Sequence, residues 1–521
     1  MKVNKLANRL DQFLGYFSPA LKVRRMRYRY AAQLLEEPLR SSASISSWRR
    51  KYEGASTSRR TEGWLTPDSS ANTEITSALS RLRARSRDLV RNNGYAARAI
   101  QVIHNNVVGA GILGQVKATS SARERDYDRL WKEWSETPQV DFEGMQTLSG
   151  LERLVMRTIA ESGECFIRKR PSRSSENLII PLQVQILEGD FVDSTLYREG
   201  NNGHKIIQGI EFDSKGRRIA YHLFEEHPGD RGWGRSITLK ANRIPARDIL
   251  HLYRIDRAGQ IRGVPWMAPC MIRLRDFDEY EDAQLVRQKI AACFTAFVQD
   301  LESQPEPLTD SDNEKLGEKV EPAMIEFLPP GKTVTFANPP GVEGYKEYTS
   351  VTLHAIAAGL GIPYECLTGD YSEVNFSSAR MGWLEFMRNI EEWRWLLLIP
   401  RFLDPVFDWF LQASELQGRN SHGVEVVWTP PKREMIDPTK EIPALIQAIR
   451  AGILTLSEVI KMYGYDPLDH LEQMRKDNET LDKLGLVLDS DPRKVSSNGN
   501  LQSTSLKSPE QEGKHESEGD D

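Results

Sequence analysis

The sequence has no long apolar run, and this shortage excludes a class of proteins. Its richest apolar stretch, Trp395 to Ile399, ends at Pro400, whereas a membrane-spanning helix needs about 20 apolar residues. The N-terminus also lacks the continuous apolar stretch and small-residue cleavage site of a secretory signal. We therefore expect a chain that stays in the cytoplasm where it is made.

Cysteine is scarce as well, with four residues in 521. They form no CxxC pair and have no histidine at metal-ligand spacing, so neither a zinc site nor a disulfide framework is indicated. We expect them to behave as small buried apolar residues: Cys165, Cys270, Cys293 and Cys366. The sequence predicts no metal and no cofactor.

Catalytic motifs are missing too: no HExxH, GxSxG or strand-following GxGxxG pattern is present. Gly331-Lys332-Thr333 matches the end of a Walker A loop, but Glu326 stands at its first glycine position and two prolines remove backbone donors. His104 follows an apolar helical pattern near its end, where a satisfied or helix-capping histidine is commoner than a general base. We predict that the chain is not an enzyme.

The composition is that of a globular chain, with 39% hydrophobic and 8% aromatic residues, long enough for two to four domains. Its net charge of −5 is unevenly placed: residues 1–60 carry 14 Lys and Arg against 4 Asp and Glu, a balance of +10. The basic arm leaves open whether it contacts nucleic acid, an acidic partner or nothing. Residues 509–521 are acidic without an apolar anchor, so we expect disorder.

Helical periodicity dominates the first third of the chain. We predict an amphipathic helix over residues 3–17, a Ser- and Arg-rich linker over 41–70, and helices over 123–135 and 148–162. Between the linker and the helix at 123–135, one apolar helical stripe runs from Ile75 to Val107. Ser70 and Asn72 are candidate N-caps before it, and Gly109 and Gly111 follow it as stop signals. Five arginines lie mostly off this stripe, which favours a solvated or partner-paired face over a nucleic-acid site: Arg81, Arg83, Arg85, Arg87 and Arg91.

The period changes to two between residues 163 and 255. Strands are predicted over 165–168, 182–187, 206–212 and 219–224, and the Ser214-Lys215-Gly216 loop indicates a hairpin. Helix returns over 266–298, a length of about 30 residues or roughly 45 Å, in which Arg273 and Arg275 precede Asp276 and Glu279 at ion-pair spacing. A helix this long usually packs against the same helix in other copies of the chain.

Helix-capping and helix-breaking residues divide the rest of the chain into shorter predicted elements. A short strand is predicted at 333–338 (TVTFAN) and a helix at 348–360. A polar stretch, GDYSEVNFSSAR (369–380), then precedes a tryptophan-rich helix that begins near Met381 and is kinked by Pro400. A final helical unit covers 437–486, with starts at Asp437-Pro438 and Asp466-Pro467 and a capping box from Thr455 to Glu458.

Several long stretches carry a family resemblance. They are LRARSRDLVRNNGYAARAIQVIHNNVVGAGI (82–112), GVPWMAPCMIRLRDFDEYEDAQLVRQKIAACF (263–294), IAAGLGIPYECLTGDYSEVNFSSARMGWLE (356–385) and, near the C-terminus, DPTKEIPALIQAIRAGILTLSEVIKMYGYDP. Each resembles the portal proteins of tailed bacteriophages, specifically the lambda-type family. The resemblance spans residues 60 to 475.

The resemblance implies an α+β portal fold, mainly helical with a β-rich insertion, assembled as a dodecameric ring. The ring would sit at one vertex of the capsid, as a channel for packaging and ejecting double-stranded DNA, after assembly in the host cytoplasm. The implied regions are a basic arm (1–60), wing (61–262, with the β-rich unit 163–255), stem helix (263–298), clip (299–345), returning stem helix (346–361), tunnel loop (362–378), kinked helix and wing–crown connection (379–431), helical crown (432–488) and acidic tail (489–521).

The implied partners are the terminase large subunit at the clip, a head-completion or adaptor protein, the major capsid and scaffold proteins, and double-stranded DNA without sequence specificity. No membrane is implied. Because each phosphate neutralised by Lys or Arg adds affinity, a loop of hydroxyls and amides suits a channel through which DNA slides. We predict that the channel is faced by Tyr371, Ser372, Glu373, Asn375 and Ser377, with Lys332 and Lys346 as basic contributors.

Alternatives stay open at this point. The polar loop could pack inside the ring and never meet DNA. The chain could also be another phage head–tail connector or minor capsid protein, or, third, a DNA-packaging enzyme such as a nucleotide hydrolase.

Overall fold

The structure is a computed structural model in which part of the chain is described. The described residues are 59, 62–64, 66–172, 178–200, 203–230, 240–292, 296–300, 332–336, 344–431, 435, 437–488, 491 and 493–495, with the backbone alone for 290–292, 296–300, 332–336 and 376. The chain divides into two units, 1–69 and 70–521, and nearly all described residues belong to the second. The predicted helix at 3–17, most of the linker, the Cys293 side chain and the acidic tail lie outside the described residues.

The single helix predicted between Ile75 and Val107 is wrong: the structure has two, α3 (Ala71–Asn92) and α4 (Gly94–Val107). Asn93 between them is extended, and its Oδ1 accepts a hydrogen bond from the N–H of Ala96 at 3.0 Å. A side chain that caps the next helix competes with helix continuation, which explains the break. Ser70, one of the two predicted candidates, caps α3, whereas the Asn72 side chain contacts the backbone of Gly259 and Ile261.

Two predicted helices follow as expected, α5 (Ser121–Ser135) and α6 (Leu148–Ser162). Helix α6 ends at Gly163, which has φ 91°, a left-handed conformation that favours glycine. A side chain at this position would also meet the backbone of Val264, because a Cβ atom would lie 2.4 Å from its carbonyl carbon. The turn after α6 thus requires glycine twice over.

The β-rich region contains two antiparallel sheets. In the first, β2 (Glu164–Pro171) lies between β3 (Leu182–Glu188) and β9 (Ile249–Tyr253). The second has five strands in chain order: β4 (Arg198–Glu199), β5 (Lys205–Ile207), β6 (Ile210–Phe212), β7 (Arg218–Phe224) and β8 (Ala241–Pro245).

The strands predicted at 165–168, 182–187 and 219–224 are confirmed, and so is the hairpin, where Gly216 has φ 80°. The single strand predicted at 206–212 is wrong. Gln208 and Gly209 both have positive φ, 52° and 74°, and they turn the chain back so that β5 pairs with β6. An apolar cluster that includes Phe166, Tyr221 and Leu223 joins the two sheets.

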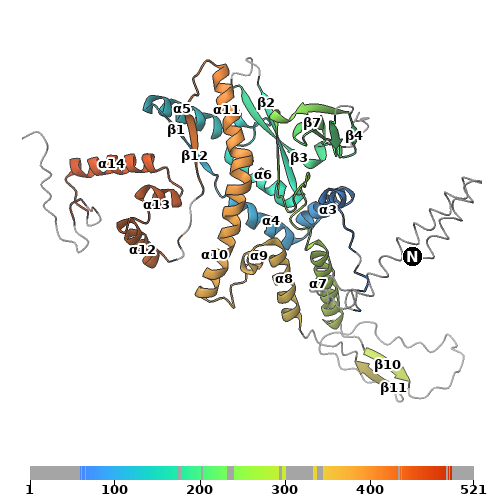
Figure 1. Cartoon of the computed structure of the whole chain (residues 1–521). Helices are drawn as coiled ribbons and strands as arrows, with labels where there is room; N and C mark the ends of the chain where they lie inside the picture. Colours follow the sequence, from blue (N-terminus) through green and yellow to red (C-terminus); the bar gives the residue numbers. More distant parts are fainter. Residues whose placement is uncertain are drawn as a thin grey trace, which may run out of the picture. The chain divides into compact units, whose positions relative to one another are not determined.

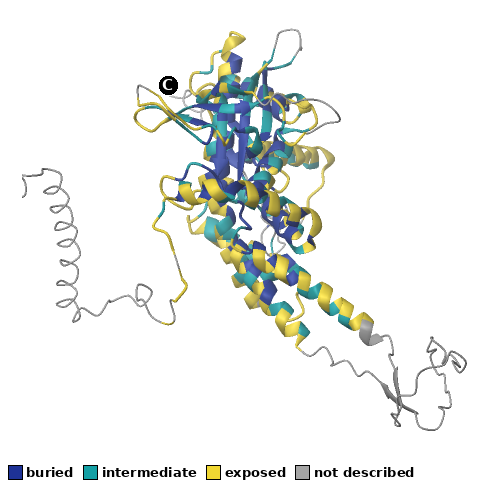
Figure 2. Ribbon diagram, turned by 90° about the vertical axis from the view of Figure 1, so that its right-hand side faces the viewer, coloured by how far each residue is buried: buried dark blue, intermediate teal, exposed yellow. Residues whose placement is uncertain are grey.

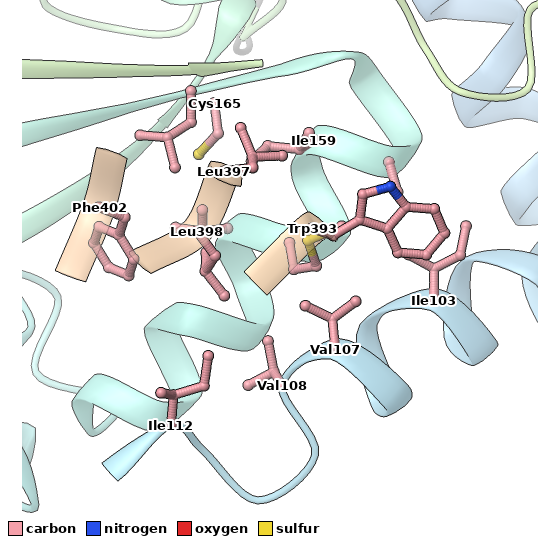
Figure 3. Packing of buried hydrophobic residues seen from close by; sticks show 14 of the residues in the cluster. Ile103, Val107, Val108, Ile112, Ile159, Cys165, Trp393, Leu397, Leu398 and Phe402 are labelled. Atoms are coloured by element: carbon pink, nitrogen blue, oxygen red, sulfur yellow. The ribbon is translucent and has the colours of Figure 1, made fainter. Parts of the chain in front are cut away.

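The main core forms where α4, α6, β2 and a later helical segment meet. Figure 3 shows Val107 and Val108 at the end of α4 near Trp393, Leu397 and Leu398 of that segment, with Cys165 of β2 at the top of the view. Cys165 and Cys270 are buried, as expected, and Cys366 is half-buried.

That later segment belongs to a long helical rod. It consists of α10 (Phe376–Glu392), a π-helical stretch (Trp393–Leu403) and α11 (Asp404–Leu416), and it continues without interruption in Figure 1. Pro400 lies inside the π-helical stretch, a form in which the backbone pattern is already altered and a missing N–H is more easily accommodated. The rod begins at Phe376 and not near Met381 as predicted, because Asn375 caps it.

The helix predicted over 266–298 is shorter than expected. Helix α7 (Met271–Ala292) has 22 residues, or about 33 Å, and Val298 belongs to strand β10 (Ala296–Asp300). Phe297 and Val298 favour extended backbone, and β10 pairs with β11 (Lys332–Phe336), which confirms most of the strand predicted there. The predicted helix at 348–360 is confirmed within α8 (Tyr345–Leu360), which lies beside α7 (Figure 1).

The remaining elements close the chain. Strand β12 (Val424–Thr429) pairs with β1 (Leu113–Ala118). Helices α12 (Pro438–Arg450), α13 (Leu456–Met462) and α14 (Pro467–Leu484) begin where predicted, and both halves of the Thr455–Glu458 capping box are present. Among the described residues, no helix is both long and apolar enough to cross a bilayer.

Candidate channel-facing loop and its supports

The polar stretch between α8 and the long rod is divided by a short helix. After Gly361 ends α8, α9 (Tyr364–Thr368) follows, and Gly369 ends it with φ 73°. The loop proper is therefore 369–375, shorter than the predicted 362–378. Tyr371 is 61% exposed, and Ser372 and Glu373 are exposed beside it, so these three predicted residues share one solvent-facing loop.

Asn375 and Ser377 lie where the loop meets α10. The Oδ1 atom of Asn375 accepts a hydrogen bond from the N–H of Ser378 at 2.9 Å, and this bond caps α10. Ser377 lies in the first turn of α10 and is exposed. Asn375 thus lies in the loop, as predicted, and is its last residue, whereas Ser377, which was also predicted to lie in the loop, is helical.

Lys346, at the start of α8, reaches this loop. Its Nζ atom lies 2.7 Å from Oε1 of Glu373, and the two side chains are 75% and 77% exposed. The hydrogen bond to Glu373 raises the pKa of Lys346, but an ion pair this exposed contributes little stability. The pairing cancels one positive charge at the loop.

Lys332 is placed elsewhere in the chain. It lies in β11, where its partner in the strand register is Asp300 of β10. A Walker A lysine stands where a phosphate-binding loop meets a helix, whereas Lys332 and Thr333 lie in a strand. The strand therefore argues against a nucleotide site at this triplet.

A buried ionic cluster around Glu164 was missed by the sequence analysis. The Glu164 carboxylate is fully buried and accepts hydrogen bonds from Arg83 at 2.6 Å and from the backbone N–H of Gly263 at 3.0 Å. Arg262 also donates to it, at 2.9 Å from Nε, and His251 Nε2 lies 3.0 Å away. The cluster ties α3, the first residue of β2, β9 and the segment leading to α7 together.

The charges in this cluster depend on one another. Burial alone would raise the pKa of Glu164, but Arg262, His251 and Arg83 outweigh it and hold that pKa well below its ordinary value. Burial lowers the pKa of His251 to about 4, so its ring is neutral at pH 7. One local signal points to this cluster: Arg83 and Arg87 are one helical turn apart on α3, and Arg87 pairs with Glu188 and Asp190.

Glu188, Asp190 and His227 place their ligand atoms within 4.8 Å of one another, and the donors present do not suit a metal ion. One Arg87 nitrogen lies 2.7 Å from the Glu188 carboxylate and 2.6 Å from that of Asp190. His227 Nδ1 accepts a hydrogen bond from the N–H of Gly229 at 3.0 Å, so Nε2 carries the proton in the neutral ring. The arrangement is an ion-pair cluster.

His104 is buried against its surroundings and carries no charge. Burial, followed by Arg153 and Arg157, lowers its pKa to about 4. Of the two roles expected, a satisfied or a helix-capping histidine, the structure does not support a cap that acts through positive charge. The end of α4 is capped by a residue far along the chain instead. Arg394 donates hydrogen bonds to the carbonyl oxygens of Val107 and Asn106, both at 2.7 Å.

Comparison with known proteins shows which family the sequence matches. The family described as phage portal protein, lambda family, matches residues 57–394. A probable portal protein of Halomonas phage phiHAP-1 is 26% identical over 487 residues, 88% of this chain and 92% of that protein. Portal protein B of Escherichia phage lambda is 23% identical over 458 residues, 77% of this chain and 84% of its own length.

Solved structures are similar as well. The neck of a native GTA particle, computed with C12 symmetry, contains a chain that is 14% identical, with a TM-score of 0.45, over 74% of this chain and 92% of that one. An HK97-family phage portal protein from Corynebacterium diphtheriae is 11% identical, with a TM-score of 0.33, over 70% and 96%.

The family match covers both the Glu164 cluster and the polar loop, and continues into the long helical rod. Portal proteins are structural components of the phage particle and not enzymes. The chain therefore belongs to the lambda family of phage portal proteins.

Proposed function

We propose that copies of this chain form a closed ring, of twelve subunits, at one capsid vertex, and that double-stranded DNA passes through its centre during packaging and ejection. Family membership supports this function. In this proposal the terminase large subunit binds β10, β11 and the neighbouring residues of the 299–345 region. A head-completion or adaptor protein and the capsid and scaffold proteins dock elsewhere on the ring. Helices α12 to α14 form the crown.

The observation that carries the ring is the exposure of apolar side chains on α7 and α8. Beyond Phe277, no residue of α7 up to Lys289 is buried, and Leu285, Val286 and, on α8, Val351 are exposed. Figure 2 shows this part of the helix pair coloured mostly as exposed or intermediate. Contacts within the pair are aromatic and polar: Tyr280 lies 4.4 Å from Tyr348 between ring centroids. Apolar faces left exposed by a helix pair favour burial between subunits.

The composition of the loop 369–375 favours a channel in which DNA binds weakly and can slide. Tyr371 and Ser372 offer exposed hydrogen-bonding groups, and the Lys346 charge is paired with Glu373. A ring multiplies every side chain by its copy number, so unpaired lysines would add affinity for phosphate at each subunit. In the proposed ring Tyr371, Ser372, Glu373, Asn375 and Ser377 face the channel, with Lys332 and Lys346 as the basic contributors.

The ring is tested by imaging the purified full-length protein by negative-stain electron microscopy. We expect annular particles with a central hole. Leu285→Glu should reduce the fraction of rings because it places charge in the subunit contact, whereas Gln288→Glu, at an exposed polar position of the same helix, should not. A protein that stays monomeric at every concentration would refute the ring.

The channel role of the loop needs a variant that leaves α10 intact. Replacing Tyr371, Ser372 and Glu373 with glycine or serine preserves the Asn375 cap. We expect normal rings and impaired retention of packaged DNA, measured as nuclease-protected DNA in assembled heads. Unchanged retention would favour a loop packed away from the DNA.

A further inference from the structure

A cavity of about 600 Å³ lies outside the regions discussed above. It is lined by the start of β1, the C-terminal half of α5, the first turns of α6 and the first residues of α14. Its volume is within the range of small-ligand and side-chain pockets, about 300–1,000 Å³. Trp131 and Leu148 provide apolar walls.

Glu152 of α6 lines this cavity and is 1% exposed. Its Oε2 atom accepts a hydrogen bond from the N–H of Ile112 at 2.8 Å. Among the residues that the structure describes, its Oε1 atom has no hydrogen-bond partner. A buried carboxyl oxygen without a donor is costly, and Glu152 lines a cavity large enough to admit one.

The other charged groups of the cavity do not supply that donor. Lys132 is held by two other acids, with Nζ 2.9 Å from Asp128 and 3.1 Å from Asp469. The Asp466 side chain is engaged in capping α14. His470 of α14 stacks on Tyr465 at 5.1 Å between ring centroids. With Glu136 at the rim, the lining holds four acids against one lysine, and that lysine is already paired.

We propose that this cavity binds a cationic side chain, a guanidinium or ammonium group from a basic protein segment, with Glu152 as its counter-ion. The aliphatic stem would lie along Trp131 and Leu148, and the charged end would donate to Oε1 of Glu152. Burial raises the pKa of Glu152 to about 8. Binding a cation therefore releases a proton at pH 7, and affinity increases with pH up to that value.

The test uses the full-length protein and two probes of nearly identical shape, L-argininamide, which is cationic, and L-citrullinamide, whose side chain is neutral. Binding is followed by thermal stability and by isothermal titration at pH 7 in two buffers of different ionisation enthalpy. We expect at least tenfold tighter binding of argininamide, accompanied by proton release. Glu152→Gln should abolish the preference while the protein stays folded, because an amide still accepts the bond from Ile112.

Glu133→Gln is the matched control, since Glu133 is exposed on α5 and does not line the cavity. It should bind argininamide as the unaltered chain does. Equal binding of the two probes, or a preference that survives in Glu152→Gln, would overturn the proposal. Tight binding without proton release would also overturn it, because the cation would then have bound elsewhere.

Discussion

Glu152 and Glu164 are both fully buried acids, yet their surroundings shift their pKa values in opposite directions. Glu152 meets one backbone N–H and no cation, so burial raises its pKa to about 8. Glu164 is surrounded by Arg83, Arg262 and His251, which hold its pKa well below the ordinary value. The number of donors that the fold brings to each carboxylate decides the difference.

The first residue-scale prediction concerns the pH profile of Glu152→Gln. In the unfolded chain Glu152 loses its proton near pH 4.5, and in the folded chain near pH 8, so stability falls as pH rises between these values. Each pH unit in this window costs about 1.4 kcal/mol. Melting temperatures from pH 5 to 9 should show a flatter profile for the variant and a gain in stability at pH 8.

The same measurement on Glu133→Gln should reproduce the profile of the unaltered chain. Parallel profiles for Glu152→Gln and the unaltered chain would show that Glu152 ionises normally, and would remove the physical basis of the cation site.

The second residue-scale prediction concerns Glu164→Gln. The substitution leaves the buried guanidiniums of Arg83 and Arg262 without their shared counter-ion. Breaking a buried pair in this way costs about 3–5 kcal/mol. Urea unfolding should show the loss as a lower midpoint, and Glu385→Gln, at an exposed position of α10, should change it by less than about 0.5 kcal/mol.

At the scale of elements, local signals predicted starts better than ends. Thr455, Asp466 and Ser70 are cap residues, and the helices that follow them begin where they predict. Asn93 is also a cap, but the apolar stripe on both sides of it continues in register and hid the break. Val298 was assigned to a helix because apolar residues in a short run fit either structure, and the pairing with β11 decided it.

The candidate site was also predicted only in part, because local sequence patterns indicate an exposed loop but not the contacts between residues far apart in the chain. Tyr371, Ser372 and Glu373 lie together in an exposed loop, which the density of polar residues had indicated. The ion pair of Lys346 with Glu373 and the Glu164 cluster join residues far apart in the chain. No local pattern encodes such pairings, because they depend on how the elements pack.

Asn93→Ala gives the element-scale prediction. It removes the N-cap of α4 together with the hydrogen bond to Asp278 of α7, which is 3.3 Å long. Loss of an N-cap costs about 1 kcal/mol, within a range of 0.5–2. Chemical denaturation should detect this loss, whereas Asn92→Ala, at the exposed position next to it, should have a smaller effect. Equal effects would mean that the cap contributes nothing specific.

At the scale of the whole molecule, residues 437–488 lack a core of their own. Throughout this stretch, all of it described, only Ile460 and Pro467 are buried, although Ile442, Ile453 and Leu468 are among many exposed apolar side chains. Helices of this length are marginal when isolated. In the proposed ring, neighbouring copies would supply the missing contacts.

We therefore expect assembly to protect this region. Limited proteolysis of a monomeric fraction should cut first within 437–488, and hydrogen exchange there should be fast. In rings both should slow, while α4 and α6, which are buried already, should exchange at the same rate in either state. Equal protection of 437–488 in monomer and ring would show that the helices are stable alone.

The pairing of β1 with β12 has a consequence for synthesis. Leu113 pairs with Thr429 and Ala118 with Val424, so most of the described core outside α3 and α4 lies between the two strands in the chain. On the ribosome, β1 emerges long before its partner and must wait with its edge unsatisfied until residue 429 has left the exit tunnel. We therefore expect a transcript truncated before that codon to yield a product prone to aggregation, because the edge of β1 would stay unpaired.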